Sequence, residues 1–407
     1  MSIEEQTKKS AELLDSHTAE MIKWHFSPET GSSFWLDWAK EQDWNPLEEV
    51  STFSDLCQKF PNFQDEWLRD LPNEVWVPQA YKGKPFNIFE TGGTTGMPKQ
   101  RIGWDDFRID YTAFSETLSD EHFPRDHYWM MVGPTGPRRL RLAIEHLANE
   151  RGCSCYFVDL DPRWVKRLIA SKQFDQARAY MDHAVDQALT ILKHRSVSAL
   201  FTTPKLLEAL AERKDLIRAG IKGVFCGGTT MDKQYARFLV EEVCEGGKIG
   251  FVPTYGNTLM GLARHHPIGP ENDYSIAYYA PQPRAVLRVI DPESNNPVEY
   301  DTWGRVELTT MTKEFFMPRF LERDEALRRL ATRHDSLYTA DVLRVEGQFA
   351  AGQVVEIRDN EDSIIGRGAT VLPSAIAKAW AVGNTESPTK NDVLLVRWDQ
   401  LIKETAS

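Results

Sequence analysis

The chain has 407 residues, of which 41% are hydrophobic and 27% charged, enough apolar material for one large domain or two smaller ones. Its 48 Lys and Arg residues against 60 Asp and Glu residues give a net charge of -12, which argues against nucleic-acid binding because that function needs a basic surface. No stretch has the length of a membrane span, and the first residues lack the apolar core of a signal peptide. The five cysteines follow neither a disulfide nor a zinc pattern, so we expect free thiols and a cytoplasmic location.

The N-terminal part is expected to be helical, and the middle to alternate between strands and helices. Residues 1 to about 80 are rich in tryptophan, which is more often a packing residue than a binding surface. Apolar residues at helical spacing run from Ala177 to Leu192. After them we expect strands at 197–201, 221–226 and 249–252, with helices between them at 204–218 and 232–244. This alternation predicts a mainly parallel sheet, in which ligands bind beyond the C-terminal ends of the strands.

Two further strands are expected at Ala285–Ile290 and Arg305–Thr309, separated by a turn-rich segment. They predict a β-rich subdomain beside the α/β core. From about residue 342 the composition loosens, and the last 25 or so residues are polar.

The most informative loop lies between residues 88 and 100, which read IFETGGTTGMPKQ. Glycines allow backbone N–H groups to approach phosphate oxygens closely, threonine hydroxyls add donors, and Lys99 supplies a positive charge. The spacing is not that of the Walker motif. The loop therefore predicts a site for the phosphates of a nucleotide.

This loop resembles the phosphate loop T-S-G-T-T-G-x-P-K-G of the adenylate-forming superfamily, which includes acyl-CoA synthetases, luciferases and peptide-synthetase adenylation domains. Gly92 replaces the serine of that pattern and Gln100 its last glycine. More segments are similar to family motifs and follow in the family's order: Val224–Gly228, Thr254–Thr258, Asp301–Glu307, Tyr338–Asp341, and residues 361–380, which look like the hinge of the phenylacetate–CoA ligase branch.

The resemblance implies an α/β fold, namely the large N-terminal domain of these enzymes at residues 1–341, followed by a hinge-like segment and a vestigial C-terminal tail at 342–407. It also implies activation of a carboxylic acid by ATP, in which the carboxylate attacks the α-phosphate to give an acyl-adenylate and pyrophosphate. The β- and γ-phosphates would be held by Thr91, Gly93, Thr94, Thr95, Gly96 and the catalytic Lys99. The adenine would be held by Gly227, Gly228, Tyr255, Gly256 and Asn257. Catalytic Thr258 would reach the α-phosphate, Asp341 would bind the ribose, and Arg344 would add a contact.

Three departures from the family limit what the resemblance implies. Leu259 stands where the family has a glutamate that binds magnesium, and leucine has no ligand for a hard cation, so Mg²⁺ is expected with an unclear ligand. Ala340 replaces a glycine before Asp341. Only 27 residues, 381–407, follow the hinge-like segment, and neither Lys390 nor Lys403 lies in the motif of the family's catalytic C-terminal lysine.

The curtailed C-terminus is similar to the adenylating proteins of phenazine antibiotic biosynthesis. The leading hypothesis is therefore that an aryl carboxylic acid, such as a phenazine carboxylate, is activated and passed to a partner reductase or acyl acceptor enzyme. The alternatives are a truncated aryl-CoA ligase and a non-catalytic protein that binds a nucleotide or an aryl acid. Arg138, Arg139 and Arg141 would meet a second carboxylate of the acid or, as the favoured reading, form a solvated basic face.

Overall fold

The computed structural model describes residues 3–92, 96–136, 139–229 and 231–328, and in addition the backbone of four short strands. These strands are β13 (Ser336–Tyr338), β14 (Val354–Arg358), β15 (Ile364–Ala369) and β16 (Leu394–Arg397). The chain forms two compact units, one of Met1–Gly269 with Asp273–Arg328 and one of Pro270–Asn272 with Arg329–Ser407. The boundary predicted between residues 341 and 342 lies outside the described residues.

A seven-stranded sheet forms the centre of the first unit, with the strand order β4-β3-β5-β6-β7-β8-β9. Its members are β3 (Tyr128–Gly133), β4 (Ser154–Asp159), β5 (Val197–Thr202), β6 (Gly223–Gly227), β7 (Gly250–Asn257), β8 (Gly261–His265) and β9 (Tyr278–Tyr279). The strands from β3 to β7 pair in parallel, and β8 and β9 continue the sheet antiparallel. The mainly parallel sheet predicted from the sequence is therefore present.

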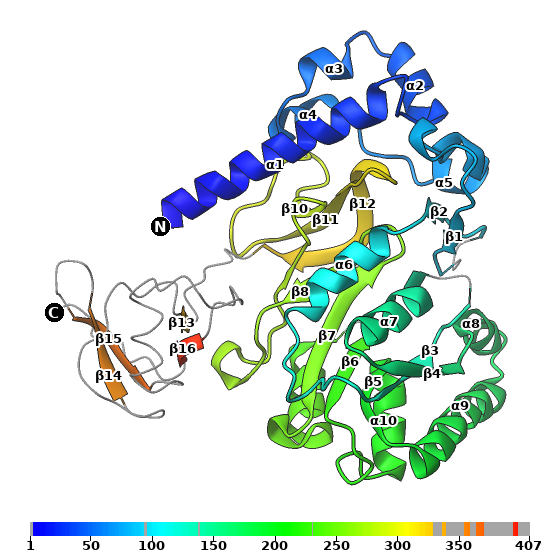
Figure 1. Ribbon diagram of the computed structural model, residues 1–407, viewed down its shortest axis with the longest axis vertical. Coiled ribbons are helices and arrows are strands. Elements are labelled where there is room, and N and C mark those ends of the chain that lie inside the picture. The colour runs from blue at the N-terminus through cyan, green and yellow to red at the C-terminus, as the bar shows by residue number, and fades with distance from the viewer. Residues whose placement is uncertain are drawn as a thin grey trace. The chain divides into compact units, whose positions relative to one another are not determined.

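Alternation along the strands explains why helices cover both faces of this sheet (Figure 1). In β5, Leu200 belongs to one hydrophobic cluster, whereas its neighbours Ala199 and Phe201 belong to another. The first cluster includes α9 (Phe174–His194) and α10 (Pro204–Arg213), and the second includes α6 (Asp106–Ser115) and α7 (Arg139–Glu150). The remaining helices of this region are α8 (Pro162–Ala170) and α11 (Lys233–Phe238).

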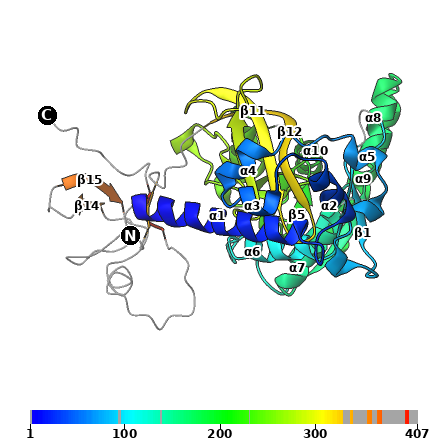
Figure 2. The same ribbon diagram turned by 90° about the horizontal axis from the view of Figure 1, so that it is seen from above.

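A third hydrophobic cluster joins the N-terminal helices to a small antiparallel sheet, which both views show on the same side of the unit (Figures 1 and 2). The sheet contains β10 (Ala285–Ile290), β11 (Trp303–Met311) and β12 (Phe316–Leu327). The helices are α1 (Ile3–Phe26), α2 (Ser33–Lys40), α3 (Pro46–Glu49), α4 (Phe53–Lys59) and α5 (Trp67–Asp70). Trp35 is 2% exposed and stacks edge-on against Phe316, so this tryptophan has the packing role expected.

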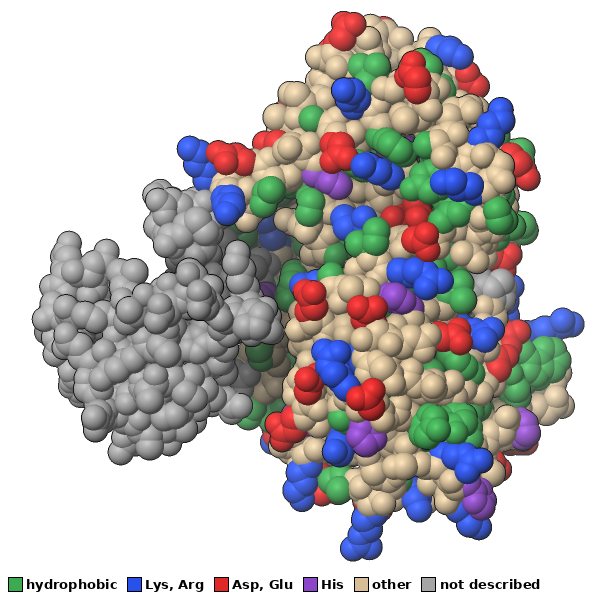
Figure 3. All heavy atoms as spheres, in the orientation of Figure 1, with side chains coloured by type: hydrophobic (Ala, Val, Ile, Leu, Met, Phe, Trp, Pro, Cys, Tyr) green, Lys and Arg blue, Asp and Glu red, His purple; other side chains and the backbone are tan. Residues whose placement is uncertain are grey.

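On the face drawn in Figure 3, acidic and basic side chains are interspersed over the described part of the chain. All five cysteines are free thiols, as predicted. Among the described residues, no helix is both long enough and apolar enough to cross a membrane.

Candidate active site

The predicted phosphate loop is the turn of a hairpin formed by β1 (Asn87–Glu90) and β2 (Gln100–Gly103). Two hydrogen bonds close the loop: the Thr91 N–H donates to the Lys99 carbonyl, and the Lys99 N–H donates to Thr91 Oγ1, both at 3.0 Å. Gly96 has a φ of 130°, a conformation that favours glycine. Gly93, Thr94 and Thr95 lie outside the described residues.

The segment from Tyr255 to Thr258 meets this hairpin although it lies far along the chain. Thr258 Oγ1 donates to the Glu90 carbonyl at 3.0 Å, immediately before the loop. Asn257 Oδ1 accepts from the N–H groups of Leu259 and Met260 at 2.8 and 2.9 Å, which fixes a tight turn after β7. The structure therefore brings together two of the motifs that the resemblance assigned to nucleotide binding.

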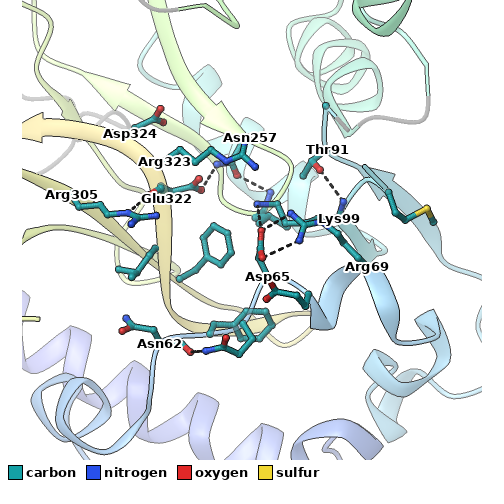
Figure 4. A pocket seen from close by; sticks show the side chains of 18 of the residues that line it. Asn62, Asp65, Arg69, Thr91, Lys99, Asn257, Arg305, Glu322, Arg323 and Asp324 are labelled. Carbon is teal, nitrogen blue, oxygen red and sulfur yellow. Dashed lines mark hydrogen bonds and ion pairs between the residues drawn. The ribbon is translucent and has the colours of Figure 1, made fainter. Parts of the chain in front are cut away.

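Between these segments lies a cavity of about 680 Å³, within the usual size of small-molecule sites (Figure 4). It is lined by residues of four regions: the segment around α5, the phosphate loop with one residue of α8, the turn after β7, and β11 with β12. The lining residues are Asn62, Phe63, Gln64, Asp65, Glu66, Arg69, Thr91, Gly92, Met97, Lys99, Lys166, Asn257, Leu259, Arg305, Phe320, Leu321, Glu322, Arg323 and Asp324.

Lys99 lies inside this cavity and is held by a carboxylate. Its Nζ is 3.4 Å from Asp65 Oδ2 and 4.6 Å from the centre of the Phe320 ring, and its side chain is 14% exposed. Arg69 donates to both oxygens of the same carboxylate at 3.0 and 2.6 Å. Burial raises the pKa of Asp65, but the hydrogen bond from Arg69 and the charge of Lys99 outweigh it, so the net shift is downward. Asp65 therefore stays ionised and forms an ion pair with Lys99.

Two carboxylates of β12 receive hydrogen bonds from β7. Asn257 Nδ2 donates to Glu322 Oε1 at 2.5 Å, and the Tyr255 hydroxyl donates to Asp324 Oδ2 at 2.9 Å. Burial raises the pKa of Glu322, with partial opposition from the Asn257 hydrogen bond. Burial, followed by the charge of Asp324, raises the pKa of Tyr255. These contacts fix the turn after β7 against β12.

The remaining predicted adenine residues lie next to this segment but do not line the cavity. Gly227 pairs with Thr254, and a Cβ on Gly227 would be 2.1 Å from Thr254 Oγ1, so glycine is required there. Gly228 has a φ of 91°. Gly256 also needs glycine, since its Cβ would be 2.0 Å from the Gly261 carbonyl oxygen. The cavity is lined by neither Gly227, Gly228, Tyr255 nor Gly256. Asp341 and Arg344 lie outside the described residues.

Leu259, at the position of the family's magnesium-binding glutamate, supplies no side-chain ligand for a metal. Leu259 is 1% exposed, and its carbonyl accepts hydrogen bonds from the buried Arg101 and from Thr310. Among residues whose placement is described, no group of three or more His, Cys, Asp and Glu side chains is arranged to hold a metal. Glu322 and Asp324 are carboxylates of the cavity wall, and Mg²⁺ bound with a nucleotide takes only one or two such ligands besides phosphate oxygens.

Of the three arginines near residue 140, Arg139 differs from the solvated basic face that the sequence favoured. Arg138 lies outside the described residues. Arg139 is 4% exposed and pairs with Asp110 at 2.8 Å, so a solvated basic face is wrong for this residue. Asp110 also accepts from Arg284 Nε at 2.9 Å. Arg141 is exposed and lies 5.0 Å from the centre of the Phe157 ring.

Sequence reasoning missed the contribution of α8 to this site. Arg163 Nη2 is 2.7 Å from Glu90 Oε2 and 3.4 Å from the Thr91 carbonyl oxygen. The Lys166 ammonium would be 3.7 Å from a Cβ built on Gly92. The only signal in the sequence is a run of basic residues on a helix that follows a strand.

Two structures of 2-hydroxyisobutyryl-CoA ligase are similar to this chain. An open conformation in complex with 2-HIB-AMP and CoA matches with a TM-score of 0.55 and 16% identity, over 80% of this chain and 71% of that one. A postadenylation state in complex with R3-HIB-AMP matches with a TM-score of 0.57 and 16% identity, over 80% of this chain and 64% of that one. The chain thus spans only part of the ligase, and the likeness confirms the predicted mixed α/β fold of adenylate-forming ligases at the level of fold.

A family model described as the PUA domain matches residues 318–388. The match begins inside β12, which pairs with β11 in the first unit, and continues into the second unit. Since residues 329–407 belong to a compact unit with four described strands, the prediction that a C-terminal domain is missing or vestigial is not confirmed. No curated protein matches this chain.

Proposed function

We propose that this protein is an adenylate-forming enzyme that activates a carboxylic acid with ATP, giving an acyl-adenylate and pyrophosphate. One observation carries the proposal: the phosphate loop and the Tyr255–Thr258 segment meet, since Thr258 donates to the Glu90 carbonyl at 3.0 Å, and Lys99 and Asn257 line one cavity beside them. The shared fold with a ligase whose structures contain an acyl-AMP supports the proposal.

In the proposed reaction, a carboxylate oxygen attacks the α-phosphorus in line with the bond to the β-phosphate bridging oxygen. The new acyl–phosphate bond forms as that bond breaks, and pyrophosphate leaves with the electron pair. The protein mainly positions the reactants and stabilises the leaving charge. Lys99 stabilises this charge by leaving its ion pair with Asp65, which lies 3.4 Å away, and binding the phosphates instead.

Thr258 has one hydroxyl proton, which the Glu90 carbonyl accepts in this structure. Donation to the α-phosphate therefore requires that this bond be released. We infer that Thr258 holds the phosphate loop in place before the nucleotide binds and transfers its hydrogen bond afterwards. Since Leu259 replaces the expected glutamate and the described residues show no group of three or more metal-ligating side chains, no step is assigned to a protein-held metal.

The sequence resemblance supports a narrower proposal, namely that the acid is an aryl carboxylate such as a phenazine carboxylate, handed to a partner reductase or acyl acceptor. A second candidate is a nucleotide- or acid-binding protein without catalysis. Leu259 favours this second candidate, because it is 1% exposed and its side chain has no atom that can bind Mg²⁺.

The test is acid-dependent exchange of labelled pyrophosphate into ATP, measured across aryl and aliphatic mono- and dicarboxylic acids. The proposal predicts exchange with at least one acid and its loss in Lys99→Ala. Lys40→Ala is a matched control, because Lys40 is exposed on α2 and pairs only locally with Asp37. ATP binding without exchange in any acid would replace the enzyme proposal with the non-catalytic one.

A further inference from the structure

We propose that Lys166, on α8, is a binding residue for the β- and γ-phosphates of the nucleotide. This inference rests on the proposed function, since it assumes that the cavity beside the phosphate loop takes a polyphosphate. Lys166 lines that cavity together with Thr91, Gly92 and Lys99. Nothing in the sequence resemblance assigned a role to this residue.

The position of Lys166 relative to Gly92 is the first observation behind the proposal. Gly92 stands where the family's loop has a serine, so this chain lacks one hydroxyl donor for phosphate oxygens. The Lys166 ammonium lies 3.7 Å from the point that a Cβ on Gly92 would occupy. The chain therefore supplies a cation beside the place where the family pattern supplies a hydroxyl.

The second observation is that α8 is attached to the loop it would serve. Arg163, three residues before Lys166 and so on the same face of α8, pairs with Glu90 at 2.7 Å and donates to the Thr91 carbonyl at 3.4 Å. The helix start is fixed as well, because Asp161 Oδ1 accepts from the Arg163 N–H at 2.8 Å and Pro162 follows. In both ribbon views α8 and β1 lie at the same end of the unit (Figures 1 and 2).

The third observation concerns charge. The cavity wall contains four carboxylates and five cationic side chains, namely Asp65, Glu66, Glu322 and Asp324 and, as cations, Arg69, Lys99, Lys166, Arg305 and Arg323. A triphosphate placed among these carboxylates needs cations from the protein, and Asp65 already pairs with both Lys99 and Arg69. A lysine ammonium is suited to this task because it acts as a mobile point charge on phosphate.

The experiment is calorimetric titration of the full-length protein with ATP, inorganic pyrophosphate and AMP. Lys166→Gln is compared with Arg167→Gln, which removes the same charge from the next position of the same helix, and both residues are exposed. We expect Lys166→Gln to weaken ATP and pyrophosphate binding about tenfold, as for loss of a hydrogen bond to a charged group, and to leave AMP binding unchanged. Arg167→Gln should behave like the unmodified protein.

A second variant tests whether a serine hydroxyl at position 92 can replace the Lys166 ammonium as a phosphate-binding group. Gly92→Ser has room, because the Cβ would have only an ordinary contact with Lys166 and Gly92 has no left-handed φ. Adding Gly92→Ser to Lys166→Gln should recover part of the lost ATP affinity.

The outcomes separate this inference from the proposed function. Equal ATP affinities in Lys166→Gln and Arg167→Gln would overturn the role of Lys166 and leave the enzyme proposal intact. Tenfold weaker polyphosphate binding in Lys166→Gln, with no acid-dependent exchange in the unmodified protein, would support Lys166 while overturning the enzyme proposal. Absence of both ATP and pyrophosphate binding in the unmodified protein would overturn both.

Discussion

Asp65 gives the sharpest prediction about nucleotide binding, because it forms an ion pair with Lys99 when no phosphate is bound. The pair is mostly shielded from solvent, with Lys99 14% and Asp65 27% exposed, and the two atoms are 3.4 Å apart. At this distance and exposure the pair is worth about 1 kcal/mol, between a surface pair and a buried charged hydrogen bond. ATP must displace this interaction, so Asp65→Asn should bind ATP about fivefold more tightly, since 1.4 kcal/mol corresponds to tenfold.

The assay is calorimetric titration with ATP, and Glu66→Gln is the matched control. Glu66 also lines the cavity, so its replacement removes the same charge from the same wall. Asp65→Asn should exceed Glu66→Gln in its gain of affinity. Equal gains would mean that the effect comes from the net charge of the cavity and not from the Asp65–Lys99 pair. Weaker ATP binding in Asp65→Asn would refute the view that Asp65 competes with phosphate for Lys99.

Two further predictions concern stability. Gly227→Ala should lower the free energy of unfolding by roughly 1–3 kcal/mol, because its Cβ would be 2.1 Å from Thr254 Oγ1, whereas Gly136→Ala, with open space around its Cβ, should change it little in urea denaturation. His25 is buried and its Nε2–H donates to the Thr312 carbonyl at 2.7 Å, and burial lowers its pKa to about 4, below the unfolded value of 6.5. The unfolded state therefore binds the proton first as the pH falls below 6.5, and stability should decrease by about 2 kcal/mol between pH 7 and pH 5. His25→Gln should remove that part of the pH dependence, and an unchanged dependence would contradict the assignment.

Local sequence patterns predicted the helices and strands whose structure depends mainly on their own residues. The strand predicted at Ala285–Ile290 is β10 with the same bounds, and the helical stripe from Ala177 to Leu192 lies within α9. The strand predicted at Arg305–Thr309 extends to Trp303–Met311 as β11, because its ends pair with β12. Such extensions depend on a partner strand that the local sequence does not reveal.

The candidate site was predictable only where one continuous motif carried it. Thr91 and Lys99 belong to a single loop, and Asn257 to a single turn, and the structure places all three at the cavity. Asp65 carries no local signal and Lys166 only that of a basic helix, because their relation to the loop arises only when the segment around α5 and α8 pack beside the hairpin. Arg139 shows the reverse error, since its charge favoured a solvated face while its contact with Asp110 buries it.

Direct detection of the acyl-adenylate by mass spectrometry tests the central claim most directly. The protein would be incubated with ATP, Mg²⁺ and the acid that gives the greatest pyrophosphate exchange, or with the whole acid panel in turn. The account predicts an acid–AMP adduct and pyrophosphate in equal amounts, with both lost in Lys99→Ala and retained in Lys40→Ala. ATP bound in the cavity without any acid–AMP adduct, across all the acids, would contradict it.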